Sequence, residues 1–344
     1  MKSVFPAFFF LMYYGTALCQ TGFSVQPSLG IGKVLGQRQD FHASLYGLSL
    51  DLNRETYGKN YWQSAHKFPQ TGLQLSMVKG AEEMLGTVYS VIPYIEFNIW
   101  KTGFGTLQIK HGTGLAYATQ CYQTSSNSEN KLLGSKLNAS SIIDAGYKIN
   151  WKANWRIKAG VTLGHISNGN LVQPNGGLNS ITGYGMLVYY PYGHTALGPC
   201  AAVPTKPKRW RYRINAMTGL YNYDKELKVI QNTNQLSLIA FYQHSPRFRS
   251  GIGFEASRID VKLHPVFAIY AEEEVLIGHV ATRYGLGFYC SSPAEMSRLY
   301  EKIGLAWYPL KLKDQVAEKF SVGAAIKAHA FRAAHVELSV GYTL

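Results

Sequence analysis

After residue 14 the sequence lacks any apolar run long enough to span a bilayer as an α-helix, which needs about 20 residues. It also lacks a helical hydrophobic period of useful length, a linker and an internal repeat. Cysteine is scarce, with four residues in 344, and the wide spacing of these four gives no metal signature. These absences argue against a helical membrane protein, a repeat protein and a cysteine-bound metal site.

Charged residues are few as well, at 16% of the chain, and the formal net charge is +14. A basic surface can bind either nucleic acid or anionic lipid. Export through a membrane, for which the N-terminus gives evidence, argues against nucleic acid. The phosphates of an anionic glycolipid are therefore the better-supported partner.

The N-terminus has the pattern of a secretory signal peptide. Lys2 supplies the positive charge, residues 4–14 are apolar and aromatic, and Ala17-Leu18-Cys19 fits a small-x-small cleavage site. Residues 1–19 are therefore predicted to be removed. The alternative is a lipid-modified Cys19, which the bulky Leu18 disfavours. Three cysteines then remain, and one disulfide can form among them, at Cys121, Cys200 and Cys290.

The C-terminal segment alternates between an apolar and a polar or small face. The apolar face holds five residues: Val336, Leu338, Val340, Tyr342 and Leu344. A strand has period two, so this pattern is that of a strand with one apolar surface. It resembles the closing strand of bacterial outer-membrane barrels, which their barrel-assembly machinery recognises, with Leu in place of the usual terminal Phe.

Similar alternation recurs along the chain, which is rich in glycine (34) and tyrosine (24). These features are typical of a membrane β-barrel. We predict an all-β fold, a transmembrane antiparallel up-and-down β-barrel of about 12–14 strands. Residues 20–344 would form this single outer-membrane domain. Glu272, Glu273 and Glu274 form a charge run, which we interpret as a solvated loop or a lumen-facing rim.

The strand that ends near Gly164 carries a histidine and a serine on its apolar face. Alternate residues from Trp155 are apolar up to Leu163, and His165 and Ser167 continue the same face. Serine is a weak nucleophile unless an adjacent base takes its proton, and histidine is the usual base. The pair therefore indicates hydrolysis of a substrate that arrives along an apolar face, such as a lipid ester.

The residues after the pair can complete such a site. Asn168 follows Ser167 directly, and Gly169 and Asn170 allow a sharp turn. Asparagine amides and the backbone N–H groups of turns are typical oxyanion donors. A second turn then brings Asn175 and Asn179 back beside the strand that carries His165.

Segments 165–170 and 174–179 together resemble the signature of the lipid A 3-O-deacylase (acyloxyacyl hydrolase) family of outer-membrane barrels. That signature is His-x-Ser-Asn, then an asparagine in a Pro-Asn turn, then an acidic residue four positions later. Segments 57–62, 93–97, 112–117 and 134–138 look like the longer family members from the Bacteroidetes. The likeness spans roughly residues 50–190, and the barrel pattern continues to the C-terminus.

The resemblance implies a bacterial outer-membrane serine esterase that removes an ester-linked 3-hydroxyacyl chain from the lipid A of lipopolysaccharide. Ser167 would be the nucleophile, His165 the general base and acid, and Asn179 the third catalytic residue. Oxyanion binding and positioning would fall to four residues: Asn168, Gly169, Asn170 and Asn175. The reaction needs no metal and no cofactor.

The sequence departs from the family pattern at two positions. Asn179 stands where the family has an acid, and Asn170 stands where glycine is frequent. Asparagine can orient an imidazole but cannot stabilise the imidazolium by charge. Two alternatives therefore stay open: an esterase acting on phospholipids, and a non-enzymatic or degenerate barrel. In the latter, a channel or structural protein, basic residues would line the lumen, namely Arg156, Lys158, Arg211 and Arg213.

Overall fold

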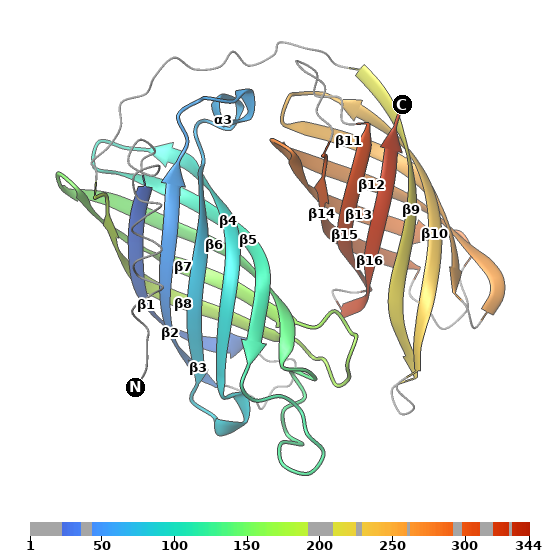
Figure 1. Cartoon of the computed structure of the whole chain (residues 1–344), viewed down its shortest axis with the longest axis horizontal. Helices are drawn as coiled ribbons and strands as arrows, with labels where there is room; N and C mark the ends of the chain where they lie inside the picture. Colours follow the sequence, from blue (N-terminus) through green and yellow to red (C-terminus); the bar gives the residue numbers. More distant parts are fainter. Residues whose placement is uncertain are drawn as a thin grey trace. The chain divides into compact units, whose positions relative to one another are not determined.

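The computed structural model describes residues 23–35, 43–191, 209–224, 229–259, 262–291, 298–309, 319–329 and 332–344. The predicted signal peptide of residues 1–19 and Cys200 lie outside these residues. The described strands form two closed antiparallel barrels of eight strands each. Figure 1 labels the strands in chain order.

In the first barrel each strand pairs with the next, and β1 also pairs with β8, which closes the sheet. Its strands are β1 (Phe23–Leu35), β2 (Ser44–Glu55), β3 (Gln70–Gly80), β4 (Thr87–Lys101), β5 (Gly105–Ala118), β6 (Leu137–Lys152), β7 (Trp155–Ser167) and β8 (Leu178–Tyr189). Two short helices, α3 (Tyr61–Ala65) and η1 (Glu83–Leu85), follow β2 and β3 in the sequence. Neither these nor any other helix of the described segments has the length and apolar character needed to cross a membrane.

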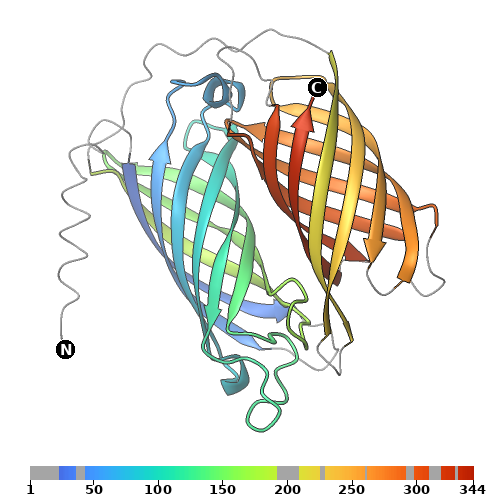
Figure 2. The ribbon, with the colours of Figure 1, turned by 45° about the vertical axis from the view of Figure 1, so that its right-hand side comes forward.

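The second barrel closes in the same way, through pairing of β9 with β16 (Figure 2). Its strands are β9 (Arg209–Asp224), β10 (Val229–Gln243), β11 (Phe248–Ile259), β12 (Lys262–Ile277), β13 (Val280–Tyr289), β14 (Leu299–Trp307), β15 (Phe320–His329) and β16 (Arg332–Thr343). In both barrels the order of strands around the sheet is the order in the sequence, which is the up-and-down arrangement.

The predicted fold class is confirmed, but the single barrel of about 12–14 strands over residues 20–344 is corrected to two barrels of eight. The predicted count therefore falls two to four strands short of the sixteen in the described segments. The run Glu272–Glu274 is not a loop, because it lies within β12, but Glu272 and Glu274 do face the lumen, where both pair with Arg213. The sequence also does not reveal which two strands pair to close a barrel, because the alternation of side chains within a strand is the same whichever strand it pairs with.

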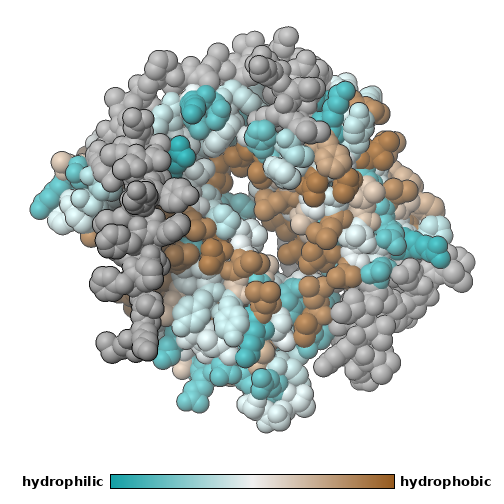
Figure 3. All heavy atoms as spheres, in the orientation of Figure 1, coloured by the Kyte–Doolittle hydropathy of each residue, from teal (hydrophilic) through white to brown (hydrophobic). Residues whose placement is uncertain are grey.

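Large apolar side chains cover the outer faces of both barrels, where they form brown areas of the surface in Figure 3. The C-terminal strand β16 behaves as its sequence predicted: Leu338, Val340 and Tyr342 are about half exposed, whereas Glu337 and Thr343 are buried. An apolar outer face with polar residues inside is the arrangement of a barrel in lipid.

Charged side chains on the inward face of the first barrel are paired with one another. Lys110 Nζ lies 2.8 Å from Asp51 Oδ2. Lys158 contacts Glu96 and lies 3.2 Å from Asp144 Oδ1. All five side chains are buried. Pairing of this kind offsets the cost of burying charges in the lumen, since a lone charge there would bear the full cost of desolvation.

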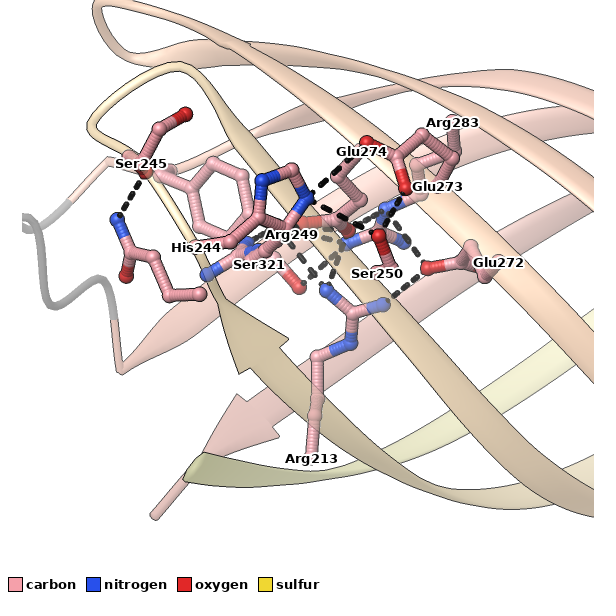
Figure 4. Close-up of polar contacts among 12 residues, drawn as sticks. Arg213, His244, Ser245, Arg249, Ser250, Glu272, Glu273, Glu274, Arg283 and Ser321 are labelled. Atoms are coloured by element: carbon pink, nitrogen blue, oxygen red, sulfur yellow. Dashed lines mark hydrogen bonds and ion pairs between the residues drawn. The ribbon is translucent and has the colours of Figure 1, made fainter. Parts of the chain in front are cut away.

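In the second barrel Glu274 is the centre of an ion-pair cluster (Figure 4). Arg213 Nη1 and Arg283 Nε each donate to Glu274 Oε1 at 2.6 Å, and Arg249 donates to Oε2. A second cluster joins Glu255 to Lys302 and to Lys327 at 2.6 and 2.7 Å. In both clusters each carboxylate is paired with at least two basic side chains.

A cavity of about 30 Å³ remains in the second barrel, lined by Glu272, Arg283, Lys302 and Glu337 among others. A buried water needs roughly 10–15 Å³ of such space, so the cavity holds a few waters at most. Arg213, which the predicted alternative of a channel places along the lumen, is buried there and paired with Glu272 and Glu274.

Candidate active site

The strand β7 presents His165 on the outer face of the first barrel. Lys158 and Thr162 point into the lumen, where they contact Asp144. The alternate residues face outward, and Leu163 is 48% exposed. His165 lies two residues beyond Leu163 and is exposed, whereas Ser167, the last residue of β7, is 2% exposed. The outward placement of the histidine follows from period two alone.

His165 connects Ser167 and Asn179 through its two ring nitrogens. The Nδ1 atom lies 2.6 Å from Asn179 Oδ1, and Nε2 lies 3.1 Å from Ser167 Oγ. An amide oxygen can only accept, so Nδ1–H donates to Asn179 and Nε2 accepts the proton of the Ser167 hydroxyl. The three residues that the sequence predicted as catalytic are therefore brought together.

The sheet register explains this meeting. His165 is the direct cross-strand partner of Asn179 in the pairing of β7 with β8. Directly opposed side chains on one face lie within roughly 4.5–5.5 Å at Cβ, which is close enough for a hydrogen bond between them. The arrangement can activate a serine hydroxyl, although the third member carries no charge.

Gly177 packs against the Cε1 edge of the imidazole, between its two ring nitrogens. Its φ of +77° lies in the region that favours glycine, and a Cβ at this position would lie 2.8 Å from His165 Cε1. A side chain here would therefore require the ring to shift. Gly177 is not among the predicted site residues, and the only signal for it in the sequence is the Gly176-Gly177 pair before β8.

The segment that connects β5 to β6 holds Gly177 in place. Gly177 N donates to Leu132 O at 2.9 Å, and Gly176 N donates to Lys131 O at 3.0 Å. Asn130 in turn donates to Met84 O at 2.8 Å. Through these hydrogen bonds, the segment fixes the position of the backbone that packs against His165.

Asn168 and Asn175, two of the predicted oxyanion and positioning residues, form hydrogen bonds within their own turn. Asn168 Nδ2 donates to Val172 O at 2.9 Å, and Asn168 N donates to Asn175 Oδ1 at 3.2 Å. Gly169 and Asn170 have φ of +66° and +72°, as a sharp turn needs. The turn is thus as expected, whereas the donation of Asn168 and Asn175 to an oxyanion stays a prediction.

An apolar groove of about 560 Å³ lies on the outer face of the first barrel, across β2 to β6. Leu115, at one end of it, pairs with Ala139, and Ala139 pairs with Ser167. The groove therefore reaches β6, the strand next to the one that ends at Ser167. Its exposed lining consists largely of leucine, valine and tyrosine: Leu48, Leu75, Tyr89, Val91, Leu115, Tyr117 and Leu137.

The described cysteines take no part in this site. Cys121 is buried and Cys290 is exposed, and both are free thiols, so no disulfide joins them. Within the described segments no group of three or more His, Cys, Asp or Glu residues is arranged to hold a metal ion.

The chain is similar to several solved structures. The outer membrane enzyme PagL shares 23% identity at a TM-score of 0.36, over 47% of this chain and 97% of its own. Neisserial surface protein A shares 13% sequence identity at a TM-score of 0.37, over 49% of this chain and 97% of its own. The translocator domain of the autotransporter NalP from Neisseria meningitidis shares 10% sequence identity at a TM-score of 0.25, over 98% of this chain and 94% of its own. No curated protein matches the chain.

Family models match both barrels. Residues 22–186 match the lipid A 3-O-deacylase (PagL) model, and these residues contain β1 to β7, most of β8 and the His165 site. Residues 210–344 match the acyloxyacyl hydrolase C-terminal domain, which corresponds to the second barrel. The chain therefore belongs to the lipid A 3-O-deacylase (acyloxyacyl hydrolase) family.

Proposed function

We propose that the protein is a serine esterase of the bacterial outer membrane that removes an ester-linked 3-hydroxyacyl chain from lipid A. Lipid A deacylation follows in general from the family. The observation that supports the mechanism is the pair of hydrogen bonds from the His165 ring, to Asn179 at 2.6 Å and to Ser167 at 3.1 Å. Because His165 is exposed on the outer face, the substrate would approach from the lipid.

In this mechanism Ser167 Oγ attacks the ester carbonyl while His165 Nε2 takes the hydroxyl proton. The tetrahedral intermediate collapses, the sugar oxygen leaves with the proton from His165, and an acyl-serine remains. Water then attacks the acyl-serine, again with His165 as base. The proton returns to Ser167 and a 3-hydroxy fatty acid is released. Asn179 keeps the ring oriented throughout.

The apolar groove beside the site suits the acyl chain. Its volume of about 560 Å³ and its lining of apolar residues match a hydrocarbon rather than a polar ligand. Because it begins near Ala139, the direct partner of Ser167, a chain whose carbonyl sits at the serine can enter it without crossing the barrel.

The test is expression of the whole protein in a host whose lipid A structure is defined, followed by mass spectrometry of the extracted lipid A. We expect lipid A to lose the mass of one 3-hydroxyacyl chain and the matching free fatty acid to accumulate. Unchanged lipid A in membranes that contain the folded protein would favour the non-enzymatic barrel. Loss of acyl chains from phospholipids alone would favour the phospholipid esterase.

Gly177→Ala is expected to lower kcat for deacylation by about tenfold to a hundredfold with little change in KM. The added Cβ would lie 2.8 Å from His165 Cε1, so the ring would have to move from the position in which it bonds Ser167 and Asn179. The acyl groove is untouched, so substrate binding should persist. The measurement is the steady-state rate of ester hydrolysis by the detergent-solubilised protein.

Gly185→Ala is the matched control, because Gly185 lies on β8, the strand that begins directly after Gly177, and a Cβ there meets no atom within 4 Å. This variant should keep the parental kcat. If Gly177→Ala also keeps it, Gly177 does not position the histidine.

A further inference from the structure

The outer face of the first barrel carries two adjacent rows of side chains around the site. Cross-strand pairing places His165 beside Ser141, and Ser141 beside Thr113. The next row toward the end of the barrel runs from Ser167 to Ala139 and then to Leu115. One row is therefore polar, and the row beside it leads from Ser167 to the acyl groove.

The polar row contains a pair of hydroxyl groups on a surface that faces lipid. Thr113 Oγ1 and Ser141 Oγ lie 3.1 Å apart, and both side chains are half-buried. Their apolar neighbours Leu115 and Ile143 are 62% and 54% exposed. Polar groups among such neighbours are costly unless hydrogen-bonded.

This hydroxyl pair has further hydrogen-bonding capacity. Each hydroxyl offers one donor and two acceptor positions, and the bond between Thr113 and Ser141 uses one donor and one acceptor. One donor and three acceptor positions remain in the inventory of the pair. A hydroxyl of a ligand, which both donates and accepts, has the complementary chemistry.

The geometry of the two rows determines which ligand atom would reach the pair. Residues two apart on one face of a strand are separated by roughly 6.6 Å, so the two rows are neighbours. An acyl chain with its carbonyl carbon at Ser167 and its tail directed along Ala139 toward Leu115 follows one row. A substituent on the carbon two bonds from the carbonyl then projects beside the other row, where Ser141 and Thr113 lie.

We propose that the Thr113–Ser141 hydroxyl pair binds the 3-hydroxyl of the acyl chain and makes the enzyme selective for 3-hydroxyacyl esters. This inference rests on the proposed esterase function and adds a specificity subsite to it. One hydrogen bond between neutral groups corresponds to about tenfold in selectivity, because it contributes about 1.4 kcal/mol.

The experiment compares two glucosamine esters of the same chain length, one with and one without the 3-hydroxyl, as substrates of the whole detergent-solubilised protein. The measured quantity is the ratio of their kcat/KM values. We expect the parental protein to favour the hydroxylated ester about tenfold or more. The combined variant Ser141→Ala and Thr113→Val should bring this ratio close to one.

Ser28→Ala is the control, since it removes a hydroxyl–hydroxyl bond of the same kind, 2.6 Å to Ser49, from the inward face of β1 and β2. It should leave the ratio at the parental value. A parental ratio of one, or a double variant that keeps the parental ratio, overturns the subsite while ester hydrolysis itself continues. Hydrolysis of neither ester by the parental protein instead counts against the proposed function.

Discussion

Ser167→Ala is expected to lower lipid A deacylation by on the order of 10⁴-fold or more, because the variant lacks the atom that forms the acyl-enzyme bond. The hydroxyl proton that His165 Nε2 accepts at 3.1 Å is lost with it. What remains is the contribution of binding and of oxyanion stabilisation. The measurement is the rate of release of 3-hydroxy fatty acid from lipid A at equal membrane abundance of variant and parent.

The variant should still fold, because Ser167 is the last residue of β7 and removal of one hydroxyl leaves the strand pairing intact. Heat-modifiable migration of the barrel on a gel checks this. Ser180→Ala, on the neighbouring strand β8 with its side chain on the inward face, is the matched serine control and should keep the parental rate. Parental deacylation by Ser167→Ala would show that the nucleophile is another residue.

The placement of His165 was predictable because it depends only on local geometry. The alternation from Trp155 to Leu163 sets the outward face of β7, and two more residues along the same strand must share it. The same reasoning identified the outward residues of β16. Where the strand is regular, period two is sufficient, and no knowledge of the partner strand is needed.

The partner of His165 was predictable for a different reason. Asn179 follows a turn-rich segment that returns the chain antiparallel, and the family motif fixed the offset between the two residues. The structure adds the register, in which His165 and Asn179 are directly opposed. The contact of Gly177 with the imidazole could not be predicted, since it depends on a backbone φ of +77° and on hydrogen bonds to Lys131 and Leu132.

The two-barrel organisation escaped prediction because closure is a long-range property. Pairing of β1 with β8 and of β9 with β16 joins segments more than a hundred residues apart in sequence. β12 could not be predicted from its acidic run, because three successive charged residues do not show the alternation of apolar and polar residues that marks a strand with one face in lipid. Glu274 is buried among Arg213, Arg249 and Arg283, and those basic residues are distant in sequence from it or lie on other strands.

Asn179 is the member of the site whose chemistry departs most from the family signature, and its replacement should have the second largest effect. Asn179→Leu removes the acceptor that lies 2.6 Å from His165 Nδ1. The ring then loses its preferred tautomer and orientation, and we expect deacylation to fall on the order of 10²-fold or more. The measurement is the deacylation rate at equal membrane abundance.

Asn179→Asp is the informative partner of that variant. A carboxylate oxygen at the position of Oδ1 still accepts from Nδ1–H and adds a negative charge beside the imidazolium that forms in the transition state. Its rate should equal or exceed that of the parent. A lower rate would mean that the site depends on the neutral amide, for example on donation from its NH₂ group. Parental activity in Asn179→Leu would show that the imidazole of His165 is oriented without Asn179.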